Sequence, residues 1–323
     1  MGLGDRGRFE EFREIFQRGK VPRVHAGKNG LETEVRETLK LAIELKKKKG
    51  HVLDVLNGKT VACIFHKPSL RTRISFEVGI HELGGHSLYI TDNEIQLGVR
   101  ESIHDVAKVL SRFVGMIEIR TFSHKSVEEL AFHASVPVIN GLTDLSHPCQ
   151  IMGDMQTIIE HKGKIDNMKI AYLGDGNNVC NSWLEAATVI PLDLRIGTRK
   201  ETMPDAETLD KARKAGKSKI LITEDPHEVA RNADVIYTDV WASMGQKDQT
   251  KSKTELLQQY QINSHLLSGA NPSHIVMHCL PAERGREITD EVIDGPHSVV
   301  FDEAENRLHA QKAIMVKLMQ FNK

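Results

Sequence analysis

The stretch FHKPSLRTRISFE, residues 65–77, says most about the fold of this chain. It closes an apolar run, residues 60–65, and passes through a proline into two hydroxyl and two guanidinium side chains. Helical spacing of apolar residues is clear from residue 75 onward. The pattern predicts a buried strand that leads through a polar loop into a helix over residues 75–83.

A strand-to-helix junction of this composition is suited to hold a phosphate. The first turn of a helix offers unpaired backbone N–H groups and the positive end of the helix dipole. Arg71 and Arg73 add planar guanidinium groups that match phosphate oxygens, and Ser69 and Thr72 add hydroxyl donors. The simpler alternative is that Ser69 caps a helix with exposed arginines, which explains one serine but not the whole cluster.

Composition limits the classes of function. The chain has 323 residues with 43 Lys and Arg against 44 Asp and Glu, so the net charge of −1 does not favour nucleic-acid or membrane-surface binding. Its four cysteines lack paired spacing, which indicates reduced thiols rather than disulfides or a zinc site. No apolar stretch is long enough to span a membrane, and residues 1–20 lack the features of a signal or transit peptide. We expect a cytoplasmic protein that contacts neither nucleic acid nor membrane.

Strand and helix patterns alternate along the chain and restart near residue 147. This alternation predicts an α/β protein with two doubly wound domains, each a parallel sheet flanked by helices. We expect one domain over residues 1–146, joined by a C-terminal helix of about 308–323, and a second over residues 147–307. Strands are expected at residues 60–65, 87–90, 116–120, 136–139, 169–173, 193–196, 220–222, 235–238 and 275–278, and a last helix over about 307–319.

Ligands in such sheets bind beyond the carboxyl ends of the strands. The polar clusters of the sequence follow strands in this way: residues 69–73, Arg120, residues 175–178, 239–245 and 278–280. We therefore expect them to form one site in the cleft between the domains.

Two motifs suggest chemistry that their spacing does not support. Residues 174–179, GDGNNV, follow a strand but lack the third glycine of a dinucleotide fingerprint, so they predict a tight turn in which Asn177 or Asn178 caps the next helix or binds a ligand. Residues 81–86, HELGGH, place two histidines five apart with glycines between them, which excludes a zinc-protease helix.

Two further motifs leave both a structural and a functional interpretation open. His147 and Gln150 lie three residues apart at the start of a helix and can reach one ligand, although from these residues alone a buried structural histidine is the favoured interpretation. Cys279 could be a nucleophile with His278 as its base. Adjacent side chains of a strand point to opposite faces, so a positioning role for Cys279 is favoured over a covalent one.

Taken together, these motifs resemble the aspartate and ornithine carbamoyltransferase family over roughly residues 40–323. Residues 69–73, SLRTR, match its Ser-x-Arg-Thr-Arg motif for carbamoyl phosphate, and residues 96–98 resemble a loop that reaches into a neighbouring subunit's site. Arg120, residues 147–150 (HPCQ) and 278–281 (HCLP), and Arg307 match further elements of that site. Two positions depart from the pattern: Leu70 stands where Thr is commonest, and His66 where Glu is common.

The resemblance implies transfer of the carbamoyl group of carbamoyl phosphate to the δ-amine of ornithine, without cofactor or metal, in a homotrimer of arginine biosynthesis. It assigns catalytic roles to Arg120, His147, Cys279 and Arg307. The implied carbamoyl-phosphate ligands are Ser69, Leu70, Arg71, Thr72, Gln96, Arg120, His147, Gln150, Cys279, Leu280 and Arg307. The implied ornithine ligands are Asn178, Asp239, Ser243 and Met244. Asp239 and Cys279 point to an amino acid with a basic side chain, and acetylornithine, succinylornithine or putrescine remain alternative acceptors.

Overall fold

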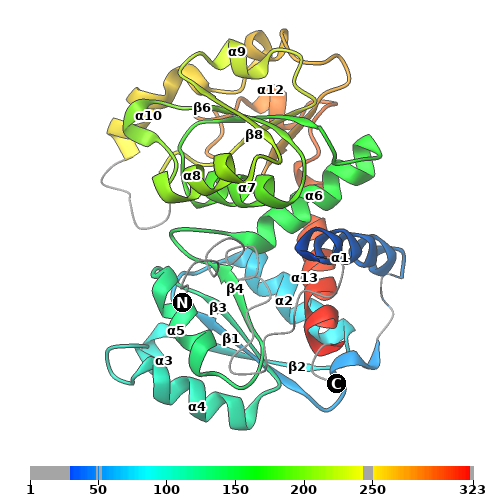
Figure 1. Ribbon diagram of the computed structural model, residues 1–323, viewed down its shortest axis with the longest axis vertical. Coiled ribbons are helices and arrows are strands. Elements are labelled where there is room, and N and C mark those ends of the chain that lie inside the picture. Colours follow the sequence, from blue (N-terminus) through cyan, green and yellow to red (C-terminus); the bar gives the residue numbers. More distant parts are fainter. Residues whose placement is uncertain (1–29, 49, 51–52, 243–249, 321–323) are drawn as a thin grey trace, which may run out of the picture. The chain divides into compact units, whose positions relative to one another are not determined.

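The structure is a computed structural model, which describes residues 30–48, 50, 53–242 and 250–320. The described chain divides into two compact units (Figure 1). The first comprises the residues up to Asp144 together with those from Leu308 onward, and the second is Leu145–Arg307. The predicted domain boundaries were between residues 146 and 147 and between residues 307 and 308, and the units of the structure divide after Asp144 and after Arg307.

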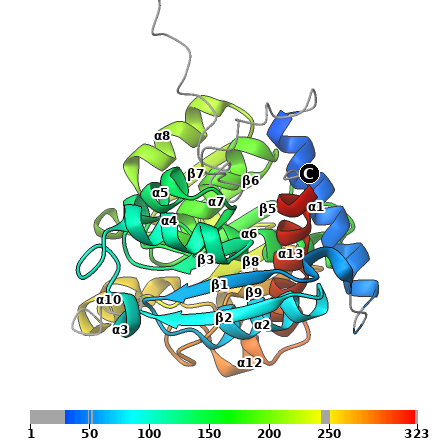
Figure 2. The ribbon, with the colours of Figure 1, turned by 90° about the horizontal axis from the view of Figure 1, so that it is seen from below.

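The first unit contains a four-stranded parallel sheet in the order β2-β1-β3-β4. The strands are β1 (Thr60–Phe65), β2 (His86–Thr91), β3 (Met116–Arg120) and β4 (Val138–Leu142). The helices are α1 (Gly30–Lys47), α2 (Leu70–Glu82), α3 (Asp92–Ile95), α4 (Ile103–Phe113), α5 (His124–His133) and the C-terminal part of α13 (Val300–Gln320). Figure 2 shows α4 and α5 over one face of this sheet and α2 on the other.

The alternation of side chains along β1 explains this sandwich. Ala62 and Ile64 are fully buried in a cluster with residues of α4 and α5, among them Val106 and Leu130. The intervening residues of β1 face α2. There burial, and to a lesser extent the negative charge of Glu77, raises the pKa of the Cys63 thiol. Burying an Ile or Leu side chain contributes about 1.5–3 kcal/mol, so both faces of the sheet are held by apolar packing.

The second unit contains a five-stranded parallel sheet in the order β7-β6-β5-β8-β9. The strands are β5 (Lys169–Leu173), β6 (Asp193–Gly197), β7 (Lys219–Thr223), β8 (Val235–Thr238) and β9 (Ile275–His278). The helices are α6 (Pro148–Lys162), α7 (Asn178–Val189), α8 (Ala206–Ala215), α9 (Pro226–Ala230), α10 (Thr250–Leu257), α11 (Ser264–Leu267), α12 (Asp290–Ile293) and the N-terminal part of α13.

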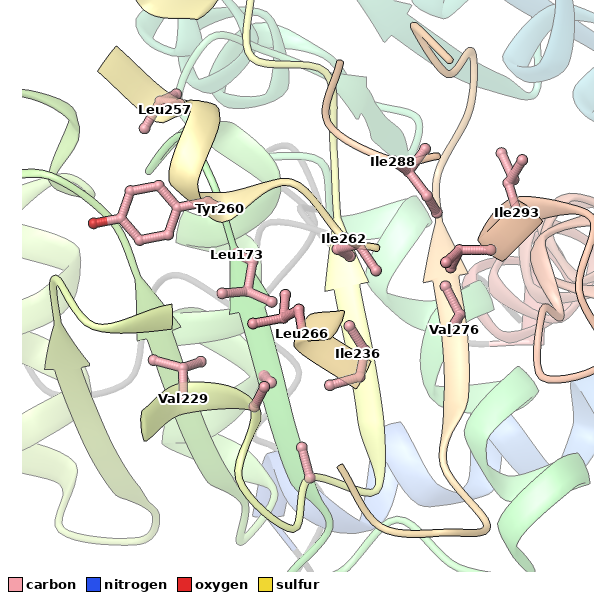
Figure 3. Close-up of a cluster of buried hydrophobic side chains, with 14 of the residues drawn as sticks. Leu173, Val229, Ile236, Leu257, Tyr260, Ile262, Leu266, Val276, Ile288 and Ile293 are labelled. Atoms are coloured by element: carbon pink, nitrogen blue, oxygen red, sulfur yellow. The ribbon is translucent and has the colours of Figure 1, made fainter. Parts of the chain in front are cut away.

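Two sets of apolar side chains sandwich this second sheet. On one face, Leu173, Ile236 and Val276 of the central strands join a buried cluster with Tyr260 and Leu266 (Figure 3). The alternate residues of the strands include Tyr172 and Tyr237, whose rings stack at a centroid distance of 5.7 Å. Trp183 of α7 packs edge-on against Tyr237.

These two sheets confirm the predicted fold class. The strands at residues 60–65, 116–120, 169–173, 235–238 and 275–278 have the expected bounds. Two helices begin earlier than expected: α2 at Leu70 rather than residue 75, and α13 at Val300 rather than about 307. For α2 the reason is a cap, because Ser69 accepts a hydrogen bond from a backbone N–H group of the first turn. Asn177 caps α7, which is one of the two predicted alternatives for that cap.

Candidate active site

The turn predicted to bind an anion, residues 69–73, follows β1 and includes the first turn of α2. Ser69 has an extended backbone, and its Oγ accepts a hydrogen bond from Thr72 N at 3.3 Å. The capping alternative is therefore correct for Ser69, and the capped first turn still presents the positive end of α2. Thr72 is buried, Arg71 is half-buried and the Leu70 side chain is exposed.

Arg120 joins this turn from the end of β3. It is buried, and its Nη1 donates to Thr72 Oγ1 at 3.3 Å, which links two residues predicted to bind carbamoyl phosphate. Arg73, by contrast, is exposed, pairs with Glu77 at 2.9 Å and stacks over the Tyr89 ring. Arg73, which was expected to add a second guanidinium group to the phosphate site, instead contacts Glu77 and Tyr89 at the surface.

The charged residues before this turn are also held by their neighbours. Lys67 is buried, forms an ion pair with Asp144 and lies 4.4 Å from the centre of the Phe122 ring. His66 Nδ1 hydrogen-bonds Thr121 Oγ1 at 2.8 Å, and Nε2 lies 3.5 Å from Asp92. Burial lowers the pKa of His66, and the Asp92 carboxylate partly opposes this.

Gln96 lies in an exposed turn directly after α3. Its backbone is left-handed, with φ 44°, which is uncommon for a residue other than glycine. Its carbonyl accepts hydrogen bonds from Val99 N and Arg100 N, so the loop after it is locally ordered. The Gln96 side chain is thereby displayed on the surface of the first unit.

In the second unit, three predicted residues converge at the start of α6. His147, Gln150 and Arg307 are all buried. Arg307 Nη1 donates to Gln150 Oε1 and lies 3.4 Å from His147 Nε2. The three-residue spacing of His147 and Gln150 therefore does place both on one side of the helix, facing a guanidinium group.

A second group lies beyond the ends of β5, β8 and β9. Asp239 is buried and accepts hydrogen bonds from Cys279 Sγ at 2.9 Å, from Asn177 Nδ2 at 2.7 Å and from Val240 N. Asn177 also accepts from two backbone N–H groups of α7 and from Tyr172. Asn177 was predicted either to cap α7 or to bind a ligand; it caps the helix, and its amide also donates to Asp239.

Cys279 and His278 make hydrogen bonds to different partners. Burial, followed by the charges of Asp239 and Glu303, raises the pKa of the Cys279 thiol well above its ordinary value. His278 Nδ1 accepts from Leu280 N and Nε2 faces Glu287, so the hydrogen of the neutral ring lies on Nε2. Cys279 is therefore a protonated donor to Asp239, not a thiolate activated by His278.

Leu280, which follows His278 and Cys279, has an uncommon backbone conformation. Its φ is 54°, a left-handed value for a residue with a side chain, and the Leu280–Pro281 peptide bond is cis. Left-handed backbone in non-glycine residues is enriched at functional sites. Both Leu280 and Gln96, which share this feature, are among the residues predicted to bind carbamoyl phosphate.

The remaining predicted residues are less informative. Asn178 is the first residue of α7 and is partly buried, and its carbonyl accepts from Ser182 Oγ. Ser243 and Met244 lie outside the described residues. Asp175, which belongs to the predicted cluster of residues 175–178 but had no role of its own assigned, is buried and forms a 2.6 Å ion pair with Lys253 of α10.

The described residues contain a group of possible metal ligands at Asp239, His278 and Cys279, whose donor atoms lie within 4.8 Å of one another. Both ring nitrogens of His278 already face hydrogen-bonding partners, and the thiol bonds the carboxylate. Protein contacts thus satisfy these atoms without an ion.

Models of two protein domains match this chain. The aspartate/ornithine carbamoyltransferase carbamoyl-P binding domain matches residues 28–160, and the Asp/Orn binding domain of the same family matches residues 166–318. The chain belongs to the aspartate/ornithine carbamoyltransferase family.

Within this family, the chain is similar to proteins named ornithine carbamoyltransferase. The chain is 52% identical to an ornithine carbamoyltransferase of Geobacter metallireducens, over 87% of this chain and 93% of that one. It is 50% identical to a chloroplastic ornithine carbamoyltransferase of Pisum sativum, over 88% of this chain and 77% of that one. Among solved structures, the Pyrococcus furiosus ornithine carbamoyltransferase is similar at a TM-score of 0.83 and 47% identity, covering 88% and 92% of the two chains.

Proposed function

We propose that this protein is an ornithine carbamoyltransferase that transfers the carbamoyl group of carbamoyl phosphate to the δ-amine of L-ornithine, giving L-citrulline and phosphate. The observation that carries the choice of acceptor is the buried Asp239 carboxylate, which accepts from Cys279 and Asn177 in the Asp/Orn binding domain. A buried carboxylate suits an ammonium group of the substrate, whereas a second carboxylate, as in aspartate, would be repelled by it.

The donor is bound by the predicted carbamoyl-phosphate residues. The capped turn of Ser69, Leu70, Arg71 and Thr72 grips the phosphate with backbone N–H groups, hydroxyl groups and a guanidinium group. Arg120 neutralises charge on the departing phosphate. His147, Gln150 and Arg307 surround the carbamoyl group, where negative charge develops on oxygen in the tetrahedral transition state. Removing one donor of this kind typically costs about 3 kcal/mol.

The acceptor must attack as a neutral amine. A free alkyl ammonium has a pKa near 10.4, by analogy with lysine, so the site must bind the uncharged form or lower its pKa. Asp239 holds the α-ammonium group, and Asn178 with Met244 the α-carboxylate. Cys279 lies next to the δ-amine as a neutral thiol, so that orientation and electrostatics, with no covalent intermediate, supply the catalysis.

We further propose a homotrimer that serves arginine biosynthesis in the cytoplasm. Leu70, Ile74 and Val78 form an exposed apolar stripe at four-residue intervals along α2, which a neighbouring copy would cover. In this assembly Gln96 is lent to the adjacent subunit's site. Among the described residues, no helix is both long and apolar enough to cross a membrane.

Steady-state kinetics with ornithine, acetylornithine and putrescine test the proposal. We expect citrulline from ornithine and little product from the other two amines. Replacing Arg71 with alanine should weaken carbamoyl-phosphate binding and lower kcat by about 10²-fold or more. The matched control is Arg36→Ala, because Arg36 pairs with Glu32 on α1 in the same unit. If Arg71→Ala left both constants unchanged, the assignment of the phosphate turn would be wrong.

A further inference from the structure

Two buried carboxyl groups of the second unit lie side by side. Asp154 projects from α6 and Glu303 from α13, both side chains are inaccessible to solvent, and both accept a hydrogen bond from Gln150 Nε2, at 2.8 Å and 3.1 Å. Two adjacent carboxylates without water would repel each other strongly, so one proton is retained by the pair.

The hydrogen bonds around the pair locate this proton. Glu303 Oε1 accepts from Gln150 Nε2 at 3.1 Å and from Tyr237 at 3.3 Å, and Oε2 accepts from His278 N at 2.9 Å. Asp154 Oδ1 accepts from Gln150 Nε2 at 2.8 Å. Asp154 Oδ2 is buried and accepts no hydrogen bond of normal geometry from the described residues; the Tyr237 hydroxyl lies near Asp154 but donates to Glu303. Asp154 Oδ2 is therefore the atom that carries the hydrogen.

This arrangement fixes the Gln150 amide in one orientation. Its two N–H bonds are directed at Asp154 and Glu303, so its oxygen is left to accept from Arg307 Nη1. With one proton, the pair carries a single negative charge, which balances the Arg307 cation across Gln150. Glu303 also holds the backbone N–H of His278, the residue before Cys279.

Burial raises the pKa of both carboxyl groups, that of Asp154 to about 7. The other titratable groups that face the pair are Arg307 of α13, Tyr237 of β8 and Cys279 after β9. Burial raises the pKa of the tyrosine and of the thiol, so neither loses a proton near neutral pH.

We propose that Asp154 and Glu303 are positioning residues that share one proton, and that this shared proton fixes the Gln150 amide toward Arg307 and the backbone ahead of Cys279. The inference rests on the proposed function in so far as Gln150, Arg307 and Cys279 bind the substrates. The proton count of the pair can be measured whether or not the protein makes citrulline.

Two isosteric variants separate the roles of the carboxyl groups. In Asp154→Asn, the amide oxygen still accepts from Gln150 and the amide N–H₂ replaces the shared proton. In Glu303→Gln, the new N–H₂ must face one of the three donors that now point at Glu303. We expect Asp154→Asn to keep most activity, whereas Glu303→Gln should lose at least about tenfold in kcat/KM for carbamoyl phosphate, because buried donors lose their acceptor.

Infrared difference spectroscopy of the whole protein tests the shared proton directly. Near neutral pH the wild-type protein should show a protonated-carboxyl band that Asp154→Asn lacks. The control Asp302→Asn changes an exposed residue of α13 that pairs with His161, and should keep the band. A wild-type spectrum without the band, or a band that survives in Asp154→Asn, would overturn the proposal even if citrulline is formed.

The pH profile distinguishes positioning from simple structural support. When rising pH removes the last proton of the wild-type pair, the two charges repel, whereas Asp154→Asn has no shared proton to lose. The activity of the wild-type protein relative to Asp154→Asn should therefore fall with increasing pH. Equal losses in Asp154→Asn and Glu303→Gln with an unchanged profile would contradict the proposal. If Glu303→Gln fails to fold by circular dichroism, the infrared result and the Asp154→Asn profile still decide.

Discussion

The thiol of Cys279 donates to a carboxylate instead of facing a base. Its Sγ lies 2.9 Å from Asp239 Oδ1, and burial together with nearby negative charge keeps it protonated. A donor of this kind can orient Asp239 and contact an incoming amine without forming a covalent bond. In the proposed site, we expect Cys279 to act through the hydrogen that it donates, not as a nucleophile.

Substitution of Cys279 tests this role. A serine retains an O–H donor to Asp239 and an alanine does not, so Cys279→Ser should keep more of kcat/KM for ornithine than Cys279→Ala. We expect a gap of about tenfold, the effect of removing one hydrogen bond to a charged group. Equal inactivation of both variants, as for a lost nucleophile, would refute the positioning role. The control is Cys63→Ser, because Cys63 lies in β1 of the other unit.

At the scale of single elements, a comparison of two helix caps can distinguish an effect on protein stability from an effect on ligand binding. Ser69 and Ser102 cap α2 and α4 in the same way, each through its Oγ to the backbone N–H three residues on. Alanine at either position should lower the free energy of unfolding by about 1 kcal/mol. Only Ser69→Ala should also raise the KM for carbamoyl phosphate, because only α2 begins in the phosphate turn. Thermal unfolding and initial rates measure the two effects, and a KM that rises equally in Ser102→Ala would remove Ser69 from the donor site.

The turn after β5 depends on a glycine for space rather than for dihedral freedom. A Cβ added at Gly176 would lie 2.3 Å from Pro204 N and 2.4 Å from Thr202 O, which are backbone atoms that cannot move aside singly. We expect Gly176→Ala to destabilise the fold by about 1–3 kcal/mol and to disturb Asn177. Gly269→Ala is the control, since a Cβ there meets nothing closer than 3.9 Å. Equal melting temperatures for the two variants would contradict this reading of the turn.

The sequence predicted the secondary-structure elements better than it predicted the contacts of single residues. Buried strands such as β1 and β8 were predicted with their exact bounds, because each is a short, mostly apolar run between polar turns. The start of α2 was missed because charged residues hide its apolar period, and only the Ser69 cap marks it. The cap at Asn177 was predicted, but the bond from its amide to Asp239 and the contacts of Asp154 and Glu303 could not be, since each depends on a partner that the chain brings near only by folding.

At the scale of the whole molecule, the proposed trimer makes a prediction that no isolated subunit can meet. Gln96 is exposed on the first unit after α3, whereas Arg71 lies in the first turn of α2, which we propose binds the phosphate. If each site uses Arg71 of one subunit and Gln96 of the next, Gln96→Ala and Arg71→Ala damage every site of their own homotrimers. Each variant alone should therefore have little activity.

Mixed trimers should recover activity, because an intact site forms wherever a Gln96→Ala subunit supplies Arg71 and its neighbour, an Arg71→Ala subunit, supplies Gln96. In a ring of three identical contacts filled at random from equal amounts, this happens at about one site in four, so activity should approach about a quarter of the wild-type value. Co-refolded mixtures are assayed after the trimer is isolated by size, and unmixed variants treated identically are the control. Recovery no greater than the sum of the two variants would show that Gln96 serves its own subunit or none, since no shared site could then have been completed.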